Sequence, residues 1–360
     1  MVFNGADIIG GDERLPTPEK PLDAYNETKA KGEEAVLAAN GKGGLFTVAL
    51  RPAGIFGSVS GEWCLPFNPS NLFTRPGDRQ LMSGLYQVYE RGQTHFQIGD
   101  NTNLFDFTYV VNVARAHLLA ADKLVPSPPL PSRTDLAKKE KSLDSDAYPL
   151  TPTEEEMISY YLPPINLTTG SLRIPTCEAR PLGPYVTLPP NAEQIVAAFE
   201  CPTTPSNRPM LRSRFDGMTV EAIARAKTIN NGLSPLQVAG QAFFITNGEP
   251  CYFWDFARAV WHGLDAKFPE ARKNKRSQIV LPRVIGLAAA TGAEWFSWLV
   301  GKEPTFTRMK VSYSCATRWH NIEKARRVLG YEPEVGLHDG VKKLVEVSVR
   351  MFITVSSLVD

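Results

Sequence analysis

The residue pair with the clearest chemistry is Tyr25 and Lys29, in the stretch Asp-Ala-Tyr-Asn-Glu-Thr-Lys. Residues 24–39 have the pattern of an amphipathic helix entered after Pro21, so the two side chains are predicted to share one face. An ammonium next to a phenol favours the phenolate. Such a pair can take a proton from an alcohol while a hydride leaves the carbon. A surface tyrosine beside a solvated lysine is the alternative, because this spacing also arises by chance.

Composition limits the other classes of function. The chain has 360 residues with a net charge of +1 and no long basic run, so we expect no nucleic-acid partner. Five cysteines and five histidines show neither Cys-x-x-Cys nor His-Glu-x-x-His spacing. The sequence therefore predicts no metal site and no disulfide scaffold, and it suits a reducing compartment.

The elements around the pair predict a crossover of a parallel sheet. The helix at 24–39 is followed by a glycine-rich turn at 40–44 and a strand-like run at 45–50. Asn321 is expected to cap a later helix that Gly330 ends, and a further helix should follow it. Other expected elements are helices within 76–92, 111–124, 217–229 and 251–264, extended segments at 94–98, 104–109 and 241–245, and a turn at 99–101.

The most apolar tract is residues 281–300, Leu-Pro-Arg-Val-Ile-Gly-Leu-Ala-Ala-Ala-Thr-Gly-Ala-Glu-Trp-Phe-Ser-Trp-Leu-Val. Its uncharged centre between Arg283 and Glu294 is too short to span a bilayer. A core or pocket-covering helix is the first interpretation, and an interfacial membrane contact is the second. The aromatic residues here and in 252–261 are expected to line a pocket or to fill the core.

Four segments, taken in order, carry a resemblance to a known family: DAYNETKAKGEEAV, ALRPAGIFG, FDFTYVVNVARAHLLA and NIEKARRVLGYEP. They resemble the extended short-chain dehydrogenases/reductases and, among these, the 3β-hydroxysteroid dehydrogenases. The resemblance implies an α/β fold: an incomplete Rossmann-like, doubly wound parallel sheet with a smaller mixed substrate-binding region. It also implies oxidation of a sterol 3β-hydroxyl by NAD or NADP. A 4α-carboxylate would then lie β to a carbonyl and could leave as carbon dioxide.

Site residues follow from the same resemblance. Tyr25 is the expected general acid/base, Lys29 is its partner, and both would also contact the cofactor, the lysine through a ribose hydroxyl. A loop would place its backbone against the nicotinamide carboxamide. The loop residues are Arg51, Pro52, Ala53, Gly54 and Ile55.

One segment bears on the substrate. The segment 105–110 resembles a motif that reads Arg-Asp-Phe-x-Tyr-Val in the nucleotide-sugar members of the superfamily. The arginine of that motif binds a diphosphate. This chain reads Phe105-Asp-Phe-Thr-Tyr109-Val. Phe105 and Tyr109 are therefore expected to contact a hydrophobic substrate, with ordinary core packing of Phe105 as the alternative.

The chain departs from the family pattern in two places. The Gly-x-x-Gly-x-x-Gly turn that seats a pyrophosphate is not found, because neither Gly10-Gly11 nor residues 41–44 follow a strand and open a helix. The family's catalytic serine is not found either. On this basis the sequence resembles a dehydrogenase that begins just after its serine.

Three regions are expected along the chain. Residues 1–125 would form the C-terminal part of an NAD(P)-binding domain, 126–236 a proline-rich insertion, and 237–360 a substrate-binding region with the C-terminal helices. Residues 58–75 interrupt the first region and are interpreted as a retained intron, with a surface loop as the alternative.

The expected function is a sterol dehydrogenase at the endoplasmic reticulum surface, held peripherally, or otherwise in the cytoplasm. Its expected partners are the sterol and, as open alternatives, a membrane surface and a second copy of the chain. Two rival functions remain. One is a non-catalytic module that binds an apolar ligand or a partner, and the other is a nucleotide-sugar epimerase or reductase.

Overall fold

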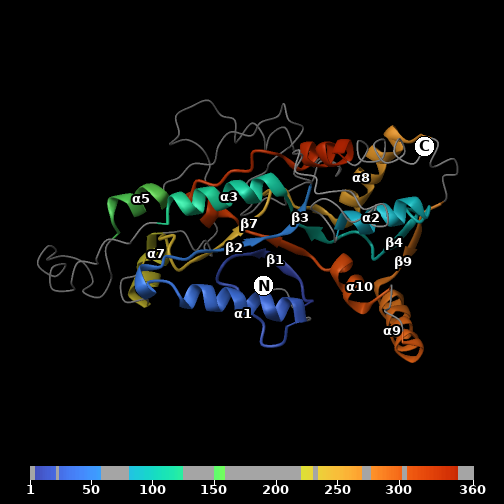
Figure 1. Cartoon of the computed structure of the whole chain (residues 1–360), viewed down its shortest axis with the longest axis horizontal. Coiled ribbons are helices and arrows are strands. Elements are labelled where there is room, and N and C mark those ends of the chain that lie inside the picture. The colour runs from blue at the N-terminus through green and yellow to red at the C-terminus, as the bar shows by residue number, and fades with distance from the viewer. Residues whose placement is uncertain are drawn as a thin grey trace, which may run out of the picture.

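The computed structural model describes residues 5–21, 24–57, 81–124, 150–158, 220–229, 234–269, 277–301 and 306–347. Helices and strands alternate through these residues (Figure 1). Among them, every strand pairing is parallel except that of β5 with β8. The α/β class and its mainly parallel strands are thus confirmed. The tract 58–75 and most of the proline-rich segment lie outside the described residues.

The strands form one four-stranded sheet and three pairs. The larger sheet has the order β1-β10-β5-β8, and the pairs are β2 with β7, β3 with β6 and β4 with β9. Strands from residues 1–125 thus pair with strands from residues 237–360, and the two ranges fold together. The bounds are β1 Ile8–Gly11, β2 Ala49–Pro52, β3 Gly54–Phe56, β4 Phe96–Ile98, β5 Leu104–Phe105, β6 Phe107–Tyr109, β7 Ala242–Ile245, β8 Cys251–Tyr252, β9 Ile279–Leu281 and β10 Arg318–His320.

The helices expected from the sequence are present where the structure describes the chain. They are α1 Ala24–Ala38, α2 Leu81–Glu90, α3 Val110–Asp122, α7 Val220–Ile229, α8 Phe253–Lys267 and α9 Arg283–Val300. The expected strand at 45–50 was placed too early, since β2 starts at Ala49. Figure 1 shows α1 and α3 on opposite sides of β2, and both pack against it. Two further helices, α5 Pro152–Ile158 and α10 Arg308–Cys315, were not expected.

The C-terminal segment folds as its capping residues predict. The Asn321 side chain accepts a hydrogen bond from the backbone N–H of Glu323 at 2.8 Å. The turn that follows includes a π-helical segment, Ala325–Leu329, and ends at Gly330, whose φ of 68° is left-handed. A second helix occupies residues 337–347.

Two large apolar clusters form most of the core, and a small third one lies around Ile8 and Ala316. One gathers aromatic side chains, in which the ring of Phe107 stacks on that of Phe256 at 3.8 Å and Phe56 meets both edge-on. The other surrounds β7 and the segment that ends in the buried Tyr331. Phe253, Phe256 and Trp261 of α8 belong to the first cluster, so the core interpretation of these aromatic residues is confirmed.

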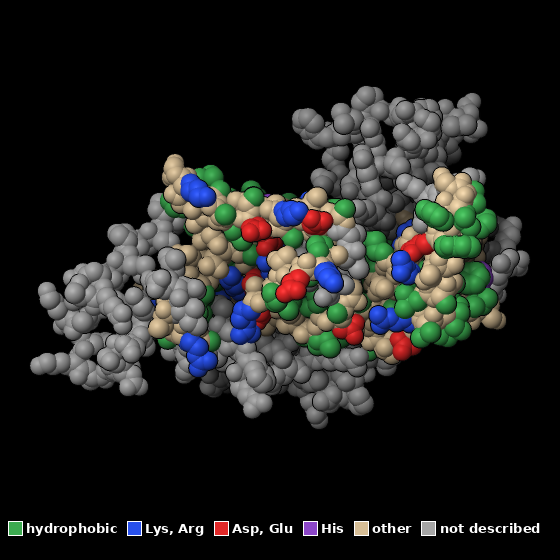
Figure 2. Space-filling view, turned by 90° about the horizontal axis from the view of Figure 1, so that it is seen from below, with side chains coloured by type: hydrophobic (Ala, Val, Ile, Leu, Met, Phe, Trp, Pro, Cys, Tyr) green, Lys and Arg blue, Asp and Glu red, His purple; other side chains and the backbone are tan. Residues whose placement is uncertain are grey.

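Helix α9 contradicts the core or pocket-covering interpretation. Only Gly286 and Ala290 of its 18 residues are buried. Its large apolar side chains, including Trp295 and Trp298, face outward, and Figure 2 shows hydrophobic side chains gathered at the right of the molecule. Within the part of the chain that the structure describes, no helix combines the length and hydropathy needed to cross a bilayer.

Candidate active site

Helix α1 presents Tyr25 and Lys29 on one open face. The Lys29 ammonium lies 5.6 Å from the centre of the Tyr25 ring, and both side chains are exposed, Tyr25 to 49%. Helix geometry alone produces this juxtaposition, because residues four apart lie one turn above each other. The prediction that Tyr25 and Lys29 share one face of a helix is confirmed. Their catalytic roles stay predictions.

One turn beyond Lys29, an ion pair fixes α1 to the sheet. The guanidinium of Arg51 on β2 binds the carboxylate of Glu33, with Nη2–Oε1 at 2.5 Å and Nε–Oε2 at 3.0 Å. The same guanidinium lies 5.3 Å from the centre of the Phe244 ring. Partial burial acts to raise the pKa of Glu33, but the hydrogen bonds and charge of Arg51 outweigh it and hold that pKa below its ordinary value. The side chain of Arg51 therefore positions the helix, while its backbone remains part of the predicted cofactor loop.

The predicted cofactor loop leads directly to the predicted substrate residues. The backbone N–H of Ala53 donates to Ile245 at 3.1 Å, and β3 then pairs with β6 so that Gly54 faces Phe107 and Phe56 faces Tyr109. A Cβ on Gly54 would lie 3.1 Å from the Phe105 ring. The close approach of backbone to ring favours glycine here, because any side chain would have to displace the ring. Gly54 is thus brought against Phe105, and Ile55 pairs with Thr108, the neighbour of Tyr109, with its own side chain exposed. Pro52 and Ala53 lie instead against Ile245 of β7.

Phe105 and Tyr109 are buried. Phe105 is 1% exposed and contacts the rings of Phe107, Phe253 and Tyr313. The Arg318 guanidinium lies over the same ring at 4.6 Å. Burial raises the pKa of the Tyr109 phenol. In this structure Phe105 therefore makes core contacts, and contact of either residue with a substrate stays a prediction.

A buried pair of asparagines, which the sequence did not single out, fixes the backbone at Tyr109. The side-chain oxygen of Asn247 accepts from the Tyr109 N–H at 3.0 Å and from the Asn112 amide at 2.9 Å. Both amides donate to the carbonyl of Val335, at 2.8 and 2.9 Å. The pair joins β6, α3 and the segment after β7. The only sequence signal for it is polar residues directly after two apolar strands.

A second buried polar group adjoins Phe105. Asp106 accepts from the backbone N–H of His320 at 2.7 Å, and its carboxylate lies 3.3 Å from the ring nitrogen Nδ1. Burial raises the pKa of Asp106, against the lowering effect of His320. The His320 ring stacks on Phe244 at 4.3 Å. These contacts join β10 to the end of β5 and to β7. They therefore link the four-stranded sheet to the pair of β2 and β7, from which the predicted cofactor loop at 51–55 emerges.

The glycines do not form a pyrophosphate cradle among the described residues. Gly10 and Gly11 end β1, where a Cβ would meet the Trp319 ring at 3.0 Å and the Leu15 side chain at 2.4 Å. Residues 41–44 lie in open space, but they follow α1 and precede β2. Residues 42–44 form a short 3₁₀ helix, and neither glycine group begins an α-helix. Among the described residues, neither glycine group therefore provides a phosphate site for a dinucleotide.

A Tyr-x-x-x-Lys helix, followed by a parallel strand and the loop at 51–55, is the arrangement that the resemblance to the short-chain dehydrogenases/reductases implies. Residues 1–149 match the model of the 3-beta hydroxysteroid dehydrogenase/isomerase family. This match covers the first 149 of the chain's 360 residues. The resemblance noted in the sequence is thus confirmed.

The curated relatives are sterol enzymes by name. The sterol-4-alpha-carboxylate 3-dehydrogenase (decarboxylating) of Schizosaccharomyces pombe is 34% identical over 343 residues, which cover 95% of this chain and 62% of that protein. The protein of the same name from Saccharomyces cerevisiae is 34% identical over 344 residues, covering 95% and 61%. The chain therefore spans about three fifths of the length of these relatives.

Solved structures resemble the chain only weakly. The UDP-glucose 4-epimerase of Thermotoga maritima is 13% identical with a TM-score of 0.41, covering 98% of this chain and 60% of that one. A likeness at this level carries no argument about function.

Proposed function

We propose that this chain contributes the catalytic pair and the substrate side of a nicotinamide-dependent dehydrogenase. The proposed reaction is oxidation of the 3β-hydroxyl of a sterol 4α-carboxylate, followed by loss of carbon dioxide. The observation that carries the proposal is the placement of Tyr25 and Lys29 on one open face of α1. The match to the family model over residues 1–149 and the names of the relatives support it.

The chain's own residues would accept the proton that the substrate hydroxyl loses during oxidation. The Tyr25 oxygen, as phenolate, accepts the proton of the substrate hydroxyl, and the Lys29 ammonium stabilises the negative charge on that oxygen. A nicotinamide dinucleotide, when bound, supplies the acceptor for the hydride. Once carbon 3 is a ketone, the carboxylate on carbon 4 can leave as carbon dioxide. The electrons of the broken bond then form an enolate, which takes up a proton.

The cofactor would contact this chain through the loop at 51–55. Gly54 has no side chain and pairs with Phe107, so backbone groups line this part of the loop. NAD and NADP differ at a ribose far from the nicotinamide. We therefore propose NAD or NADP and leave the choice to parallel assays with both cofactors.

An apolar substrate is favoured over a nucleotide sugar. In the motif Arg-Asp-Phe-x-Tyr-Val of nucleotide-sugar enzymes, the first residue is an arginine. This chain has the buried ring of Phe105 at the matching position. Arg318 lies nearby but is itself buried, with its guanidinium 4.6 Å from the centre of the Phe105 ring and 4.4 Å from that of Tyr313. A guanidinium enclosed by two rings is poorly placed to grip a diphosphate. This observation counts against an epimerase or reductase of nucleotide sugars.

The test compares variants of the full chain on one helix. Turnover of a micellar sterol 4α-carboxylate is followed through the absorbance of the reduced cofactor. We expect Tyr25→Phe and Lys29→Met to lower the rate by about 10²-fold or more, since positioned acid–base catalysis contributes about 10²–10⁴-fold. Lys31→Met is the matched control, because Lys31 lies on the same helix, is exposed and pairs with Glu27 at 2.6 Å. Unchanged turnover in Tyr25→Phe would refute the assignment.

A non-catalytic module that binds an apolar ligand is the second candidate. It is favoured by the glycines, which form no phosphate cradle in the described residues. Titration of the chain with NADH and NADPH, read by cofactor fluorescence, separates the two candidates. Sterol binding with no cofactor response and no turnover would establish the module in place of the dehydrogenase.

A further inference from the structure

Phe244 lies where several segments of the chain meet. It is the third residue of β7, is 3% exposed and pairs with Arg51 of β2. The centre of its ring lies 5.3 Å from the Arg51 guanidinium, and the ring stacks on that of His320 of β10 at 4.3 Å. One buried side chain therefore contacts both the residue that holds α1 and a residue of the four-stranded sheet.

The backbone of Phe244 is held at the outer edge of its strand. The N–H of Ala53 donates to the carbonyl of Ile245, so the odd-numbered residues of β7 direct their backbone groups toward β2. Phe244 directs its N–H away from β2, and the Glu13 carboxylate accepts it at 2.8 Å. Strand β7 is thus bonded along both edges at this point, which fixes the direction of the Phe244 ring.

The Arg51 guanidinium depends on this ring for its position. Its Nε and Nη2 bind the Glu33 carboxylate, and Nη1 is buried without a hydrogen bond within the part of the chain that the structure describes. A cation shielded from water is attracted to the face of an aromatic ring. The Phe244 ring therefore determines where the guanidinium lies, and the guanidinium determines where α1 lies.

Arg51 lies between the two parts of the predicted site. It is the first residue of the predicted cofactor loop at 51–55. Its partner Glu33 lies one turn beyond Lys29 and two turns beyond Tyr25 on α1. A shift of the guanidinium would therefore move the catalytic pair relative to the loop. Such a shift matters, because a misplacement of about 1 Å can lower a rate about 10²-fold.

We propose that Phe244 is a positioning residue for the catalytic pair of Tyr25 and Lys29. Through Arg51 and Glu33 it sets the orientation of α1 relative to the cofactor loop, and the His320 ring supports it from the neighbouring sheet. This inference rests on the proposed dehydrogenase function. Ordinary core packing is the competing role, and it predicts that any buried ring of β7 serves equally well.

Phe243→Leu is the matched control for Phe244→Leu. Phe243 is the preceding residue of β7, is fully buried and also contacts a cation, the Lys324 ammonium at 4.6 Å. Its ring faces the other side of the sheet, because successive side chains of a strand alternate. Both variants therefore lose a ring and a cation contact, but only Phe244→Leu loses the contact with Arg51.

The kinetic experiment follows oxidation of the sterol 4α-carboxylate by the full chain. We expect Phe244→Leu to lower kcat about tenfold or more with KM unchanged, since misplacement affects the reacting groups more than binding. Phe243→Leu should keep the kcat of the unmodified chain. In a Glu33→Gln chain, Phe244→Leu should have little further effect on kcat, because both substitutions act through the same guanidinium. Phe244→Met and Phe243→Met replace the two variants if the leucine forms do not fold.

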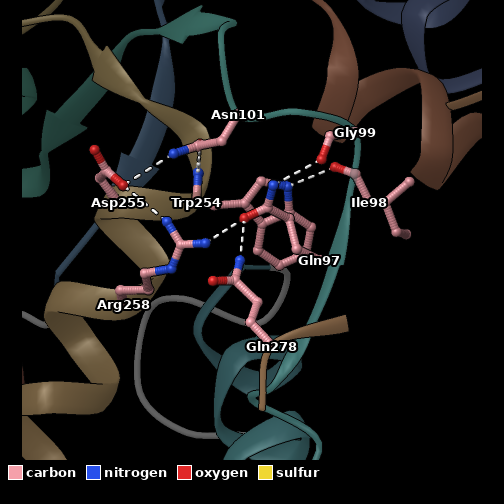
Figure 3. Close-up of polar contacts among 8 residues, drawn as sticks. All are labelled: Gln97, Ile98, Gly99, Asn101, Trp254, Asp255, Arg258 and Gln278. Atoms are coloured by element: carbon pink, nitrogen blue, oxygen red, sulfur yellow. Dashed lines mark hydrogen bonds and ion pairs between the residues drawn. The ribbon is translucent and has the colours of Figure 1, made fainter. Parts of the chain in front are cut away.

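Hydrogen exchange of the α1 amides tests the same inference without turnover. Phe244→Leu should speed exchange in α1 about tenfold more than in α8, and Phe243→Leu should show no such preference. Gln97→Leu is a control from another part of the fold. Figure 3 shows Gln97 of β4 accepting hydrogen bonds from Gln278, at 2.6 Å, and from Arg258, in a network without residues of α1, β2 or β7. Its loss should lower stability with no selective effect on α1.

Two results would overturn the proposal. The first is equal acceleration of α1 exchange by Phe244→Leu and Phe243→Leu, which would leave Phe244 with ordinary core packing. The second is selective acceleration in α1 with an unchanged kcat. If the unmodified chain shows no turnover, the proposed function fails, and the exchange measurement alone supports or overturns the positioning of α1 by Phe244.

Discussion

The ion pair between Glu33 and Arg51 determines how the helix with Tyr25 and Lys29 sits on the sheet, and its strength can be measured. The side chains are only 15% and 12% exposed. Breaking a fully buried pair costs about 3–5 kcal/mol, whereas an exposed pair on a helix contributes about 0.3–0.5 kcal/mol. Arg51 keeps its contact with the Phe244 ring when Glu33 is replaced. We therefore expect a coupling free energy of about 2 kcal/mol, below the fully buried range.

A double-mutant cycle gives this coupling. Glu33→Gln, Arg51→Met and the double variant are compared with the unmodified chain by denaturant unfolding at pH 7. The control cycle uses Glu27→Gln and Lys31→Met, an ion pair on the same helix whose side chains are 47% and 72% exposed. The control should give about 0.3–0.5 kcal/mol. A Glu33–Arg51 coupling no larger than the control would refute the inference that this pair holds α1.

The pH dependence of stability gives a second test of the Glu33–Arg51 ion pair, and the direction of the effect follows from the pKa of Glu33. The pKa of Glu33 is held below its ordinary value of 4.5 in the folded chain. A carboxylate with a depressed folded pKa stabilises the protein above the unfolded pKa, and the effect is lost as pH falls through the folded pKa. The stability difference between the unmodified chain and Glu33→Gln should thus be complete at pH 7 and shrink below about pH 4.5. A difference that grows toward acid pH would contradict the assigned pKa direction.

Two further predictions concern helix packing and capping. On α9, Gly292→Ala should stabilise the chain by about 0.5–1 kcal/mol, because no atom lies within 4 Å of the added Cβ. Gly286→Leu should destabilise it by about 1–3 kcal/mol through overpacking against Ile98, and thermal unfolding of both variants measures the contrast. Asn321→Ala should lower the free energy of unfolding by about 1 kcal/mol through loss of the bond to the Glu323 N–H, while Asn321→Asp retains most of it.

Local geometry explains which parts of the candidate site could be predicted. Tyr25 and Lys29 meet because a helix brings residues four apart together, and the helix itself is visible in the sequence. Asn321 and Gly330 likewise act through their own backbone positions. The bond between Glu33 and Arg51 joins two elements, 18 residues apart, and no short-range pattern indicates it.

The short strands, and the face of α9 that is buried, could not be predicted from the sequence for a different reason. Strand β10 is Arg-Trp-His, which shows no alternation of apolar and polar residues, and its register depends on β1 and β5. The pattern of residues 281–300 predicts a helix and its apolar content. It does not say whether the small or the large residues face the protein, because both kinds are apolar. Only the close contact at Gly286 decides this.

The two exposed helices of this chain differ in what a ligand could gain from them. The exposed side chains of α1 include the pair of Tyr25 with Lys29 and the ion pair of Glu27 with Lys31, and water solvates these polar groups at little cost. A ligand there must gain affinity from specific contacts. The outer face of α9 is apolar, so any partner that covers it gains free energy simply by removing surface from water. Proton chemistry at α1 and burial of the apolar face of α9 would thus depend on different physical forces, and a substitution on one helix should leave the contribution of the other unchanged.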